Sequence, residues 1–281
     1  MKKYDIAAYI WPAYTNKEPR SHIFWPEGIG EWQSVKNSKR KTDSYFWNRK
    51  PLWGYQDEAD PKVMEMQIEE AVKHGVNVFI YDWYWYDHRP FLEQCLNDGF
   101  LKASNRDKMK FYIMWANHTA NYTWDIRLSD RARTQKEWKL WDGAVSRADF
   151  DCVVERIITQ YFSQPNYYKI DGKPVYMLFD IMNLVRGLGG VEETWKALDY
   201  FREQTVKAGF PGLELHLTIR SRKYMATMLD DKTDIFTFIN NAGFDGVTHY
   251  NFFDYADMNK TYPELLGRIK EEWDYVDNTV K

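Results

Sequence analysis

The stretch from Val76 to Asp87, with the sequence VNVFIYDWYWYD, constrains the fold more than any other part of the chain. It begins after Gly75 as a run of β-branched and apolar residues, which is typical of a parallel-sheet strand that is buried on both faces. Parallel strands carry functional groups at their C-terminal ends. Here that end holds a carboxylate, Asp82, among tryptophan and tyrosine rings that can stack on a flat ligand.

The overall composition sets the size and the class of the protein. The 281 residues are 44% hydrophobic, which is enough for a sizeable core in one large α/β domain or in two smaller ones. The net charge is −3, with neither a basic block nor an acidic tail, so we expect no nucleic-acid partner. No GxGxxG or GxxxxGK(S/T) motif follows an expected strand, which argues against a dinucleotide-binding or P-loop fold.

Cysteines and histidines give no sign of a metal site. Cys95 and Cys152 lie far apart without a CxxC spacing, so we expect two unpaired core thiols. The six histidines show no HExxH or HxH pattern, and we expect no metal and no other cofactor. The chain starts without an apolar leader, and no segment reaches the roughly 18 apolar residues of a membrane span. We therefore expect a cytoplasmic protein, while a mature secreted form has the same pattern.

Expected strands and helices alternate along the chain. The strands cover residues 5–11, 76–87, 109–115, 175–179, 213–219 and 246–252, and the helices cover 60–75, 88–103, 149–162, 191–208, 223–229, 235–240 and 263–276. Two long aromatic loops, at about 12–58 and 116–147, follow the first and the third strand.

This alternation predicts an α/β fold, and a single (β/α)8 TIM-type barrel domain over residues 1–281 suits the length. About six strand–helix units are visible, which is two fewer than a full barrel has. Three explanations are open: two strands escape recognition, the barrel is open, or the chain is truncated at its C-terminal end.

Aromatic residues make up 17% of the chain, including 13 Trp and 20 Tyr. Many of them lie in the two long loops, where no strand or helix period assigns them to a core. Indole and phenol rings outside a core suit sugar recognition, because they combine an apolar face with a hydrogen-bonding edge. A tryptophan-rich core is the alternative for any single ring.

Polar groups and rings recur where the expected strands end. In a parallel barrel these ends meet at one face, and carboxyl groups among rings are the usual apparatus of glycoside hydrolysis. An ordinary loop anchor is the alternative for each residue. The candidate catalytic residues are Asp82, Glu31 and Asp180, and the candidate substrate-binding residues are Tyr9, Trp11, Trp32, Trp83, Trp85, Asn117, His118, Trp124, Arg220, His249, Tyr250 and Asn251.

Three blocks of the sequence resemble the glycoside hydrolase family 99-like group, also known as WbsX-like. They are WPEGIGEW at residues 25–32, DPKVMEMQIEEAVKHGVNVFIYDWYW at 60–85 and WANHTANYTWD at 115–125, and the resemblance covers roughly residues 5–180. It implies a (β/α)8 barrel that acts on a carbohydrate substrate. Named relatives are endo-acting α-mannosidases and mannanases, and similar domains occur beside polysaccharide-biosynthesis enzymes.

The resemblance also assigns individual residues. Glu31 and Trp32 match the E-W turn of the family, and Asn117 matches the asparagine of its W-A-N strand end. Asp82 stands where relatives more often have an aromatic residue, and His118 stands where many have glutamate.

The family's carboxylate motif near the end of the barrel, of the N-x-W-N-E-W type, has no counterpart in this sequence. This absence favours a substrate-holding role for Asp82 over that of principal acid or nucleophile.

Three functions follow as hypotheses. The first is a glycan-active hydrolase that is endo-acting on mannose-type or related microbial polysaccharide. The second is a non-catalytic or truncated glycan-binding protein, which the missing motif favours. The third is a transferase in surface polysaccharide biosynthesis, which we rank last because no phosphate-binding loop is visible.

Overall fold

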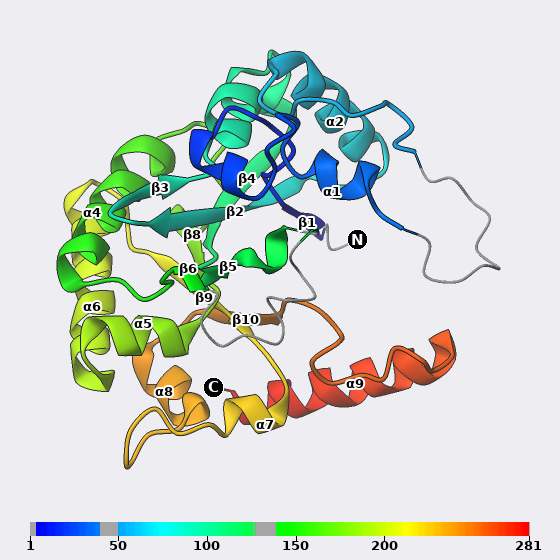
Figure 1. Ribbon diagram of the computed structural model, residues 1–281. Helices are drawn as coiled ribbons and strands as arrows, with labels where there is room; N and C mark the ends of the chain where they lie inside the picture. The colour runs from blue at the N-terminus through cyan, green and yellow to red at the C-terminus, as the bar shows by residue number, and fades with distance from the viewer. Residues whose placement is uncertain (1–3, 40–49, 126, 128–138, 281) are drawn as a thin grey trace. The chain divides into compact units, whose positions relative to one another are not determined.

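The computed structural model describes residues 4–39, 50–125, 127 and 139–280, so part of each long loop lies outside it (Figure 1). The chain forms two compact units. Unit 1 comprises Met1–Trp115, Thr119–Gly143 and Gln164–Tyr168, and unit 2 comprises Ala116–His118, Ala144–Ser163 and Lys169–Lys281. The assignment of 1–281 to a single barrel domain stays a prediction.

Unit 1 is built around three strands, β1 (Ala7–Ile10), β2 (Val78–Tyr86) and β4 (Lys110–Trp115). β2 pairs in parallel with β1 on one edge and with β4 on the other. The other elements of this unit are η1 (Pro19–Ile23), α1 (Trp32–Lys36), α2 (Pro61–Lys73), β3 (Arg89–Phe91), η2 (Cys95–Gly99), η3 (Phe100–Lys102), η4 (Arg106–Lys108), β5 (Ala120–Asn121), η5 (Tyr122–Trp124) and β6 (Lys139–Trp141).

Every residue of β2 is buried, as the sequence predicts for a strand that is covered on both faces. Tyr81 faces the helical side, where its ring lies 5.4 Å from that of Phe100 in η3 and its hydroxyl lies 3.8 Å from the sulfur of Met64 in α2. Because side chains alternate along a strand, Asp82 and Tyr84 point to the opposite face.

Helix α2 confirms the expected start signal. The carboxylate of Asp60 accepts a hydrogen bond of 2.8 Å from the backbone N–H of Lys62, and Pro61 occupies the first helical position. Val63, Met64 and Ile68 form the buried stripe. Within unit 1 the helix packs against η2, η3 and η4 (Figure 1).

The helix expected over residues 88–103 is wrong in its first half. β2 continues to Tyr86 and turns back through Asp87 and His88, which both have positive φ angles, into the antiparallel strand β3. Asp and His tolerate this left-handed conformation better than most residues, and Pro90 cannot contribute an N–H to a helix. Helical structure therefore begins only near Cys95, in the π-helix η2.

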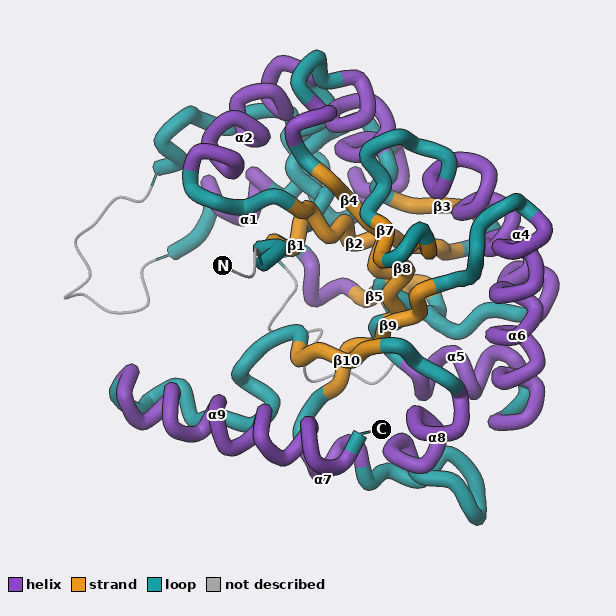
Figure 2. Tube along the Cα trace, turned by 180° about the vertical axis from the view of Figure 1, so that it is seen from behind, coloured by secondary structure: helices purple, strands orange, loops and turns teal. Residues whose placement is uncertain are grey.

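Unit 2 contains a second set of parallel strands, β8 (Lys173–Leu178), β9 (Glu214–Ile219) and β10 (Gly246–His249). The other elements of this unit are α4 (Arg147–Ile157), η6 (Ile158–Phe162), β7 (Lys169–Ile170), α5 (Ile181–Leu188), α6 (Val191–Lys207), α7 (Arg222–Met225), α8 (Ile235–Ala242) and α9 (Tyr262–Thr279). Helices α4, α5 and α8 each pack against α6 (Figure 2).

Sequence reasoning missed helix α5, which starts immediately after β8. Asp180 caps it by accepting a bond of 3.0 Å from the backbone N–H of Asn183, and Gly189 ends it with a φ of 93°. Two further expectations need correction. α7 and β10 are shorter than the expected ranges, and Cys152 is exposed rather than a core thiol, although both cysteines are free as expected.

No helix among the described residues combines the length and the apolar character that crossing a membrane requires.

The turn before α1 depends on two glycines in the left-handed region, Gly28 with a φ of 75° and Gly30 with a φ of 58°. A Cβ atom on Gly28 meets empty space, whereas one on Gly30 overlaps the backbone of Ala13 and Thr15. Gly30 therefore lets the turn lie directly against the segment that follows β1.

We predict that Gly28→Ala lowers the free energy of unfolding by about 1–2 kcal/mol, which is the cost of the left-handed conformation alone. Gly30→Ala should cost about 1–3 kcal/mol more, because the added methyl group also displaces backbone. Urea denaturation of both variants measures the difference. Equal losses for the two variants contradict the close approach at Gly30.

Candidate functional site

The E-W turn brings Glu31 to the C-terminal end of β1. The backbone N–H of Glu31 donates to the carbonyl of Ala13 at 2.9 Å, which fixes the turn. The indole N–H of Trp11, the residue that follows β1, donates to the carboxylate of Glu31. Two residues that were expected at the site are therefore in direct contact.

Burial controls the electrostatics of this carboxyl group. Removal from water raises the pKa of Glu31, and the hydrogen bond from Trp11 opposes part of that increase because it stabilises the charged form. Nearby, burial followed by the charges of Glu31 and Glu58 raises the pKa of Tyr14 to about 12. The Tyr14 ring lies 4.3 Å from that of Trp32, so the acid sits in an aromatic setting.

Rings from distant segments of unit 1 meet at Trp11. Its ring lies 5.6 Å from that of Tyr84 in β2 and 5.4 Å from that of Trp124 in η5, both edge-to-face. Trp124 also lies 5.9 Å from Tyr84, so the three rings form one cluster. Tyr9 of β1 lies beside Ile80 of β2, so by the alternation of side chains it shares the face of β2 that carries Asp82 and Tyr84.

Asp82 lies on the face of β2 that carries Tyr84, and it is only 4% exposed. Trp83 points the other way and is 1% exposed. Its indole N–H donates to Glu93 at 2.6 Å, and its ring contacts those of Trp85 and Trp115. The alternation of the strand thus places Asp82 with the Trp11 cluster and Trp83 in the core of unit 1.

Two expected residues of unit 2, Asn117 and Asp180, are joined by reciprocal hydrogen bonds. The amide of Asn117 donates to the backbone carbonyl of Asp180 at 2.7 Å and accepts from its backbone N–H at 2.7 Å. The side chain of Asp180 caps α5 and lies 3.6 Å from the guanidinium of Arg220. This carboxylate is held by a cap and an ion pair, an arrangement that suits positioning better than proton transfer.

Phe179, just before Asp180, brings three expected residues of unit 2 together. Its ring lies 5.6 Å from that of His118 and 5.1 Å from that of Tyr250, and the Arg220 guanidinium carbon lies 5.1 Å from its centroid. These residues follow different strands in the sequence and meet at one ring within this unit, while their role in a binding site stays a prediction. Phe179 was not among the candidate residues, because an aromatic residue at the end of an apolar strand is usually a core residue.

At the end of β10, polar atoms gather around a buried carboxylate. Glu272 of α9 is 1% exposed and bonds to Arg222 at 2.8 Å, with the imidazole of His249 at 3.9 Å. Burial lowers the pKa of His249, so neutral imidazole is favoured. Buried polar atoms of His249, Asn251 and Tyr255 have no hydrogen-bond partner within the described ranges, so their hydrogen-bonding capacity is unused.

Sequence reasoning missed one carboxyl group, Glu58. Burial raises its pKa to about 7, while hydrogen bonds from Gln67 and Cys95 oppose the shift. One sequence feature could have indicated Glu58. It stands two residues before the Asp60–Pro61 helix start, where the chain enters the core.

Within the described parts of the chain, no group of three or more His, Cys, Asp or Glu side chains could hold a metal ion.

Two solved structures share the fold of this chain. A glycoside hydrolase-like protein is 15% identical with a TM-score of 0.53, over 95% of this chain and 63% of that one. The GH99 endo-α-mannosidase from Bacteroides thetaiotaomicron, in complex with bis-tris propane, is 12% identical with a TM-score of 0.52, over 98% of this chain and 67% of that one. The expected α/β fold of the glycoside hydrolase type is thereby confirmed.

The chain belongs to the family described as Glycosyltransferase WbsX, whose model matches residues 6–272. No curated protein matches it. The chain spans a little less than two thirds of the glycoside hydrolase-like protein. The family resemblance seen in the three sequence blocks is thus confirmed, and it extends well beyond residue 180.

We predict that Trp11→Phe raises the pKa of Glu31 further, because the charged carboxylate loses its indole donor. When folding raises the pKa of a carboxyl group, the free energy of unfolding falls as pH rises and the group loses its proton. Relative to the wild type, the variant should therefore lose more stability at about pH 8 than at about pH 4. Carboxyl NMR titration and urea denaturation at both pH values test this. Trp25→Phe is the control, and the same Glu31 pKa in both variants contradicts the prediction.

Trp83→Ala should lower the free energy of unfolding by about 3–5 kcal/mol, because it leaves a large cavity in a packed core. It also removes the indole donor to Oε1 of Glu93, whose Oε2 accepts from the amide of Asn97 at 3.3 Å. Thermal and urea denaturation measure the loss. A loss below ~1 kcal/mol together with weaker sugar binding contradicts the core placement of this ring.

Proposed function

We propose that the protein is a glycan-active glycoside hydrolase, endo-acting on mannose-type or related microbial polysaccharide. The observation that carries the proposal is the setting of Glu31. It is a half-buried carboxyl group with a raised pKa that accepts a hydrogen bond from the Trp11 indole. It lies near Tyr14, whose ring is 4.3 Å from that of Trp32. Membership of the WbsX family and the glycoside hydrolase type of fold support the same reading.

In this proposal Glu31 is the general acid. A carboxyl group whose pKa is raised by an apolar setting keeps its proton nearer to neutral pH, and it can give that proton to the glycosidic oxygen as the bond to the leaving sugar breaks. A water molecule forms the new bond to the anomeric carbon and releases its own proton to solvent, from which the carboxylate is protonated again. The Trp11 N–H then stabilises the carboxylate that forms. Asp82, on the face of β2 that carries Tyr84, holds a substrate hydroxyl.

Within each unit, taken by itself, rings and polar groups at the strand ends bind sugar. In unit 1 we assign this role to Tyr9, Trp11, Trp32 and Trp124, with Trp83 and Trp85 supporting them from the core. In unit 2 we assign sugar binding to residues that follow the ends of its strands. Asp180 positions two of them, Asn117 by a hydrogen bond and Arg220 by an ion pair. These unit 2 residues are Asn117, His118, Arg220, His249, Tyr250 and Asn251.

The test is release of reducing sugar from α-mannans and other microbial polysaccharides. Glu31→Gln should reduce kcat by about 10²–10⁴-fold, the usual contribution of a general acid. The matched control is Glu27→Gln, because Glu27 lies in the same turn but forms an exposed ion pair with Lys36. Asp82→Asn should mainly raise KM. Full activity of Glu31→Gln on a polysaccharide that the wild type cleaves overturns the assignment.

A transferase is the second candidate, and the description of the matched family favours it. A transferase passes the sugar to an acceptor hydroxyl rather than to water. Incubation with nucleotide-sugar donors and oligosaccharide acceptors separates the two, because product elongation without free-sugar release points to transfer. Binding of glycan with neither reaction points to a non-catalytic protein.

A further inference from the structure

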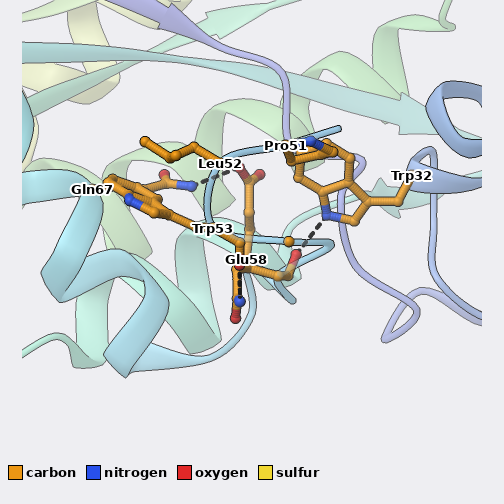
Figure 3. A pocket seen from close by; sticks show the side chains of 8 residues that line it. Trp32, Pro51, Leu52, Trp53, Glu58 and Gln67 are labelled. Atoms are coloured by element: carbon orange, nitrogen blue, oxygen red, sulfur yellow. Dashed lines mark hydrogen bonds between the residues drawn. The ribbon is translucent and has the colours of Figure 1, made fainter. Parts of the chain in front are cut away.

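A pocket of about 310 Å³ lies in unit 1, beside α2 and the segment that precedes it (Figure 3). This volume is at the lower end of the ~300–1,000 Å³ range of small-molecule sites. Its walls are mostly apolar, and Gln56, Glu58 and Gln67 contribute amide or carboxyl groups that can form hydrogen bonds. The lining residues are Trp32, Pro51, Leu52, Trp53, Gly54, Gln56, Glu58 and Gln67.

The polar part of the pocket is fixed by neighbouring hydrogen bonds. The amide of Gln67 in α2 donates to Oε1 of Glu58 at 2.8 Å. Oε2 of Glu58 has only the weak thiol donor of Cys95, at 3.7 Å. Because burial raises the pKa of Glu58 to about 7, both protonation states occur near neutral pH, so this carboxyl group can donate as well as accept.

Two tryptophans supply the apolar walls. The Trp32 indole N–H donates to the backbone carbonyl of Gln56 at 2.6 Å, which orients its ring. In Figure 3 the Trp32 and Trp53 rings lie on opposite sides of the Glu58 side chain.

Large apolar side chains at and beside the pocket are exposed to solvent. Leu52 is 95% exposed, and Trp53 and Tyr55 are each 39% exposed. Leu52 and Trp53 line the pocket, and the Tyr55 ring lies 5.7 Å from that of Trp32, so exposed apolar side chains adjoin the cavity, as at many binding surfaces.

We propose that this pocket is a subsite for one neutral pyranose ring of the glycan, with the ring stacked on Trp53 and its hydroxyls bonded to Glu58 and Gln67. The choice of a sugar rests on the proposed function. A pyranose combines an apolar face with a rim of hydroxyls, which matches ring walls and a carboxyl–amide pair. Among the eight described residues that line the pocket none is basic, which disfavours an anionic ligand.

The experiment measures binding of α-mannotriose, maltotriose and cellotriose to the full chain by isothermal titration. Trp53→Ala should weaken the affinity for the bound trisaccharide about tenfold, and Trp53→Phe should restore most of it, because a smaller ring keeps a stacking face. The control is Trp273→Ala on α9, which removes an indole that is 55% exposed and lies in unit 2. It should bind like the wild type.

A spectroscopic readout places the sugar at this pocket. In protein labelled with 5-fluorotryptophan, the ¹⁹F resonance that is missing from the Trp53→Phe spectrum identifies Trp53, and it should shift on addition of the trisaccharide. Binding to the wild type with an unmoved Trp53 resonance and unchanged affinity in Trp53→Ala overturns the subsite and leaves the proposed function standing. Absence of binding and of polysaccharide cleavage in the wild type overturns both.

Discussion

The parallel pairing of β2 on both of its edges is the constraint on which unit 1 depends. The backbone hydrogen bonds to β1 and β4 fix the register, and the register fixes which side chains face which way. Asp82 and Tyr84 share the face of the Trp11 ring cluster, while Tyr81 and Trp83 face the helical side. A slip by one residue exchanges the two sets, which places a carboxylate in the apolar core.

The carboxyl groups of the protein differ in chemistry because their surroundings differ. Burial raises the pKa of Glu31 and Glu58, since each has few donors to compensate for lost water. Asp180 instead accepts a cap bond and lies near Arg220, so its charge is compensated. A carboxyl group with a raised pKa, such as that of Glu31 or Glu58, keeps its proton nearer to neutral pH, which is what a general acid requires.

Much of the fold could be predicted from local signals. The Asp60–Pro61 start of α2 and the apolar run of β2 are encoded by residues adjacent in sequence, and both were predicted well. The failures occurred where a short local signal competed with a longer pattern. The β2–β3 hairpin turns through Asp87 and His88 rather than glycines, and α5 follows β8 without a connecting loop.

The sequence by itself determined the alternation of strands and helices, the family, and the residue types at the strand ends. Only the tertiary structure decided which of these residues meet. The contact between Trp11 and Glu31 joins positions that local patterns cannot relate, and the Glu58 carboxyl group meets the thiol of Cys95, 37 positions further along the chain. Local preference acts over a few residues, whereas desolvation and ring packing depend on the whole surroundings of a side chain. For that reason Asp82 and Trp83, adjacent in the chain, occupy different environments.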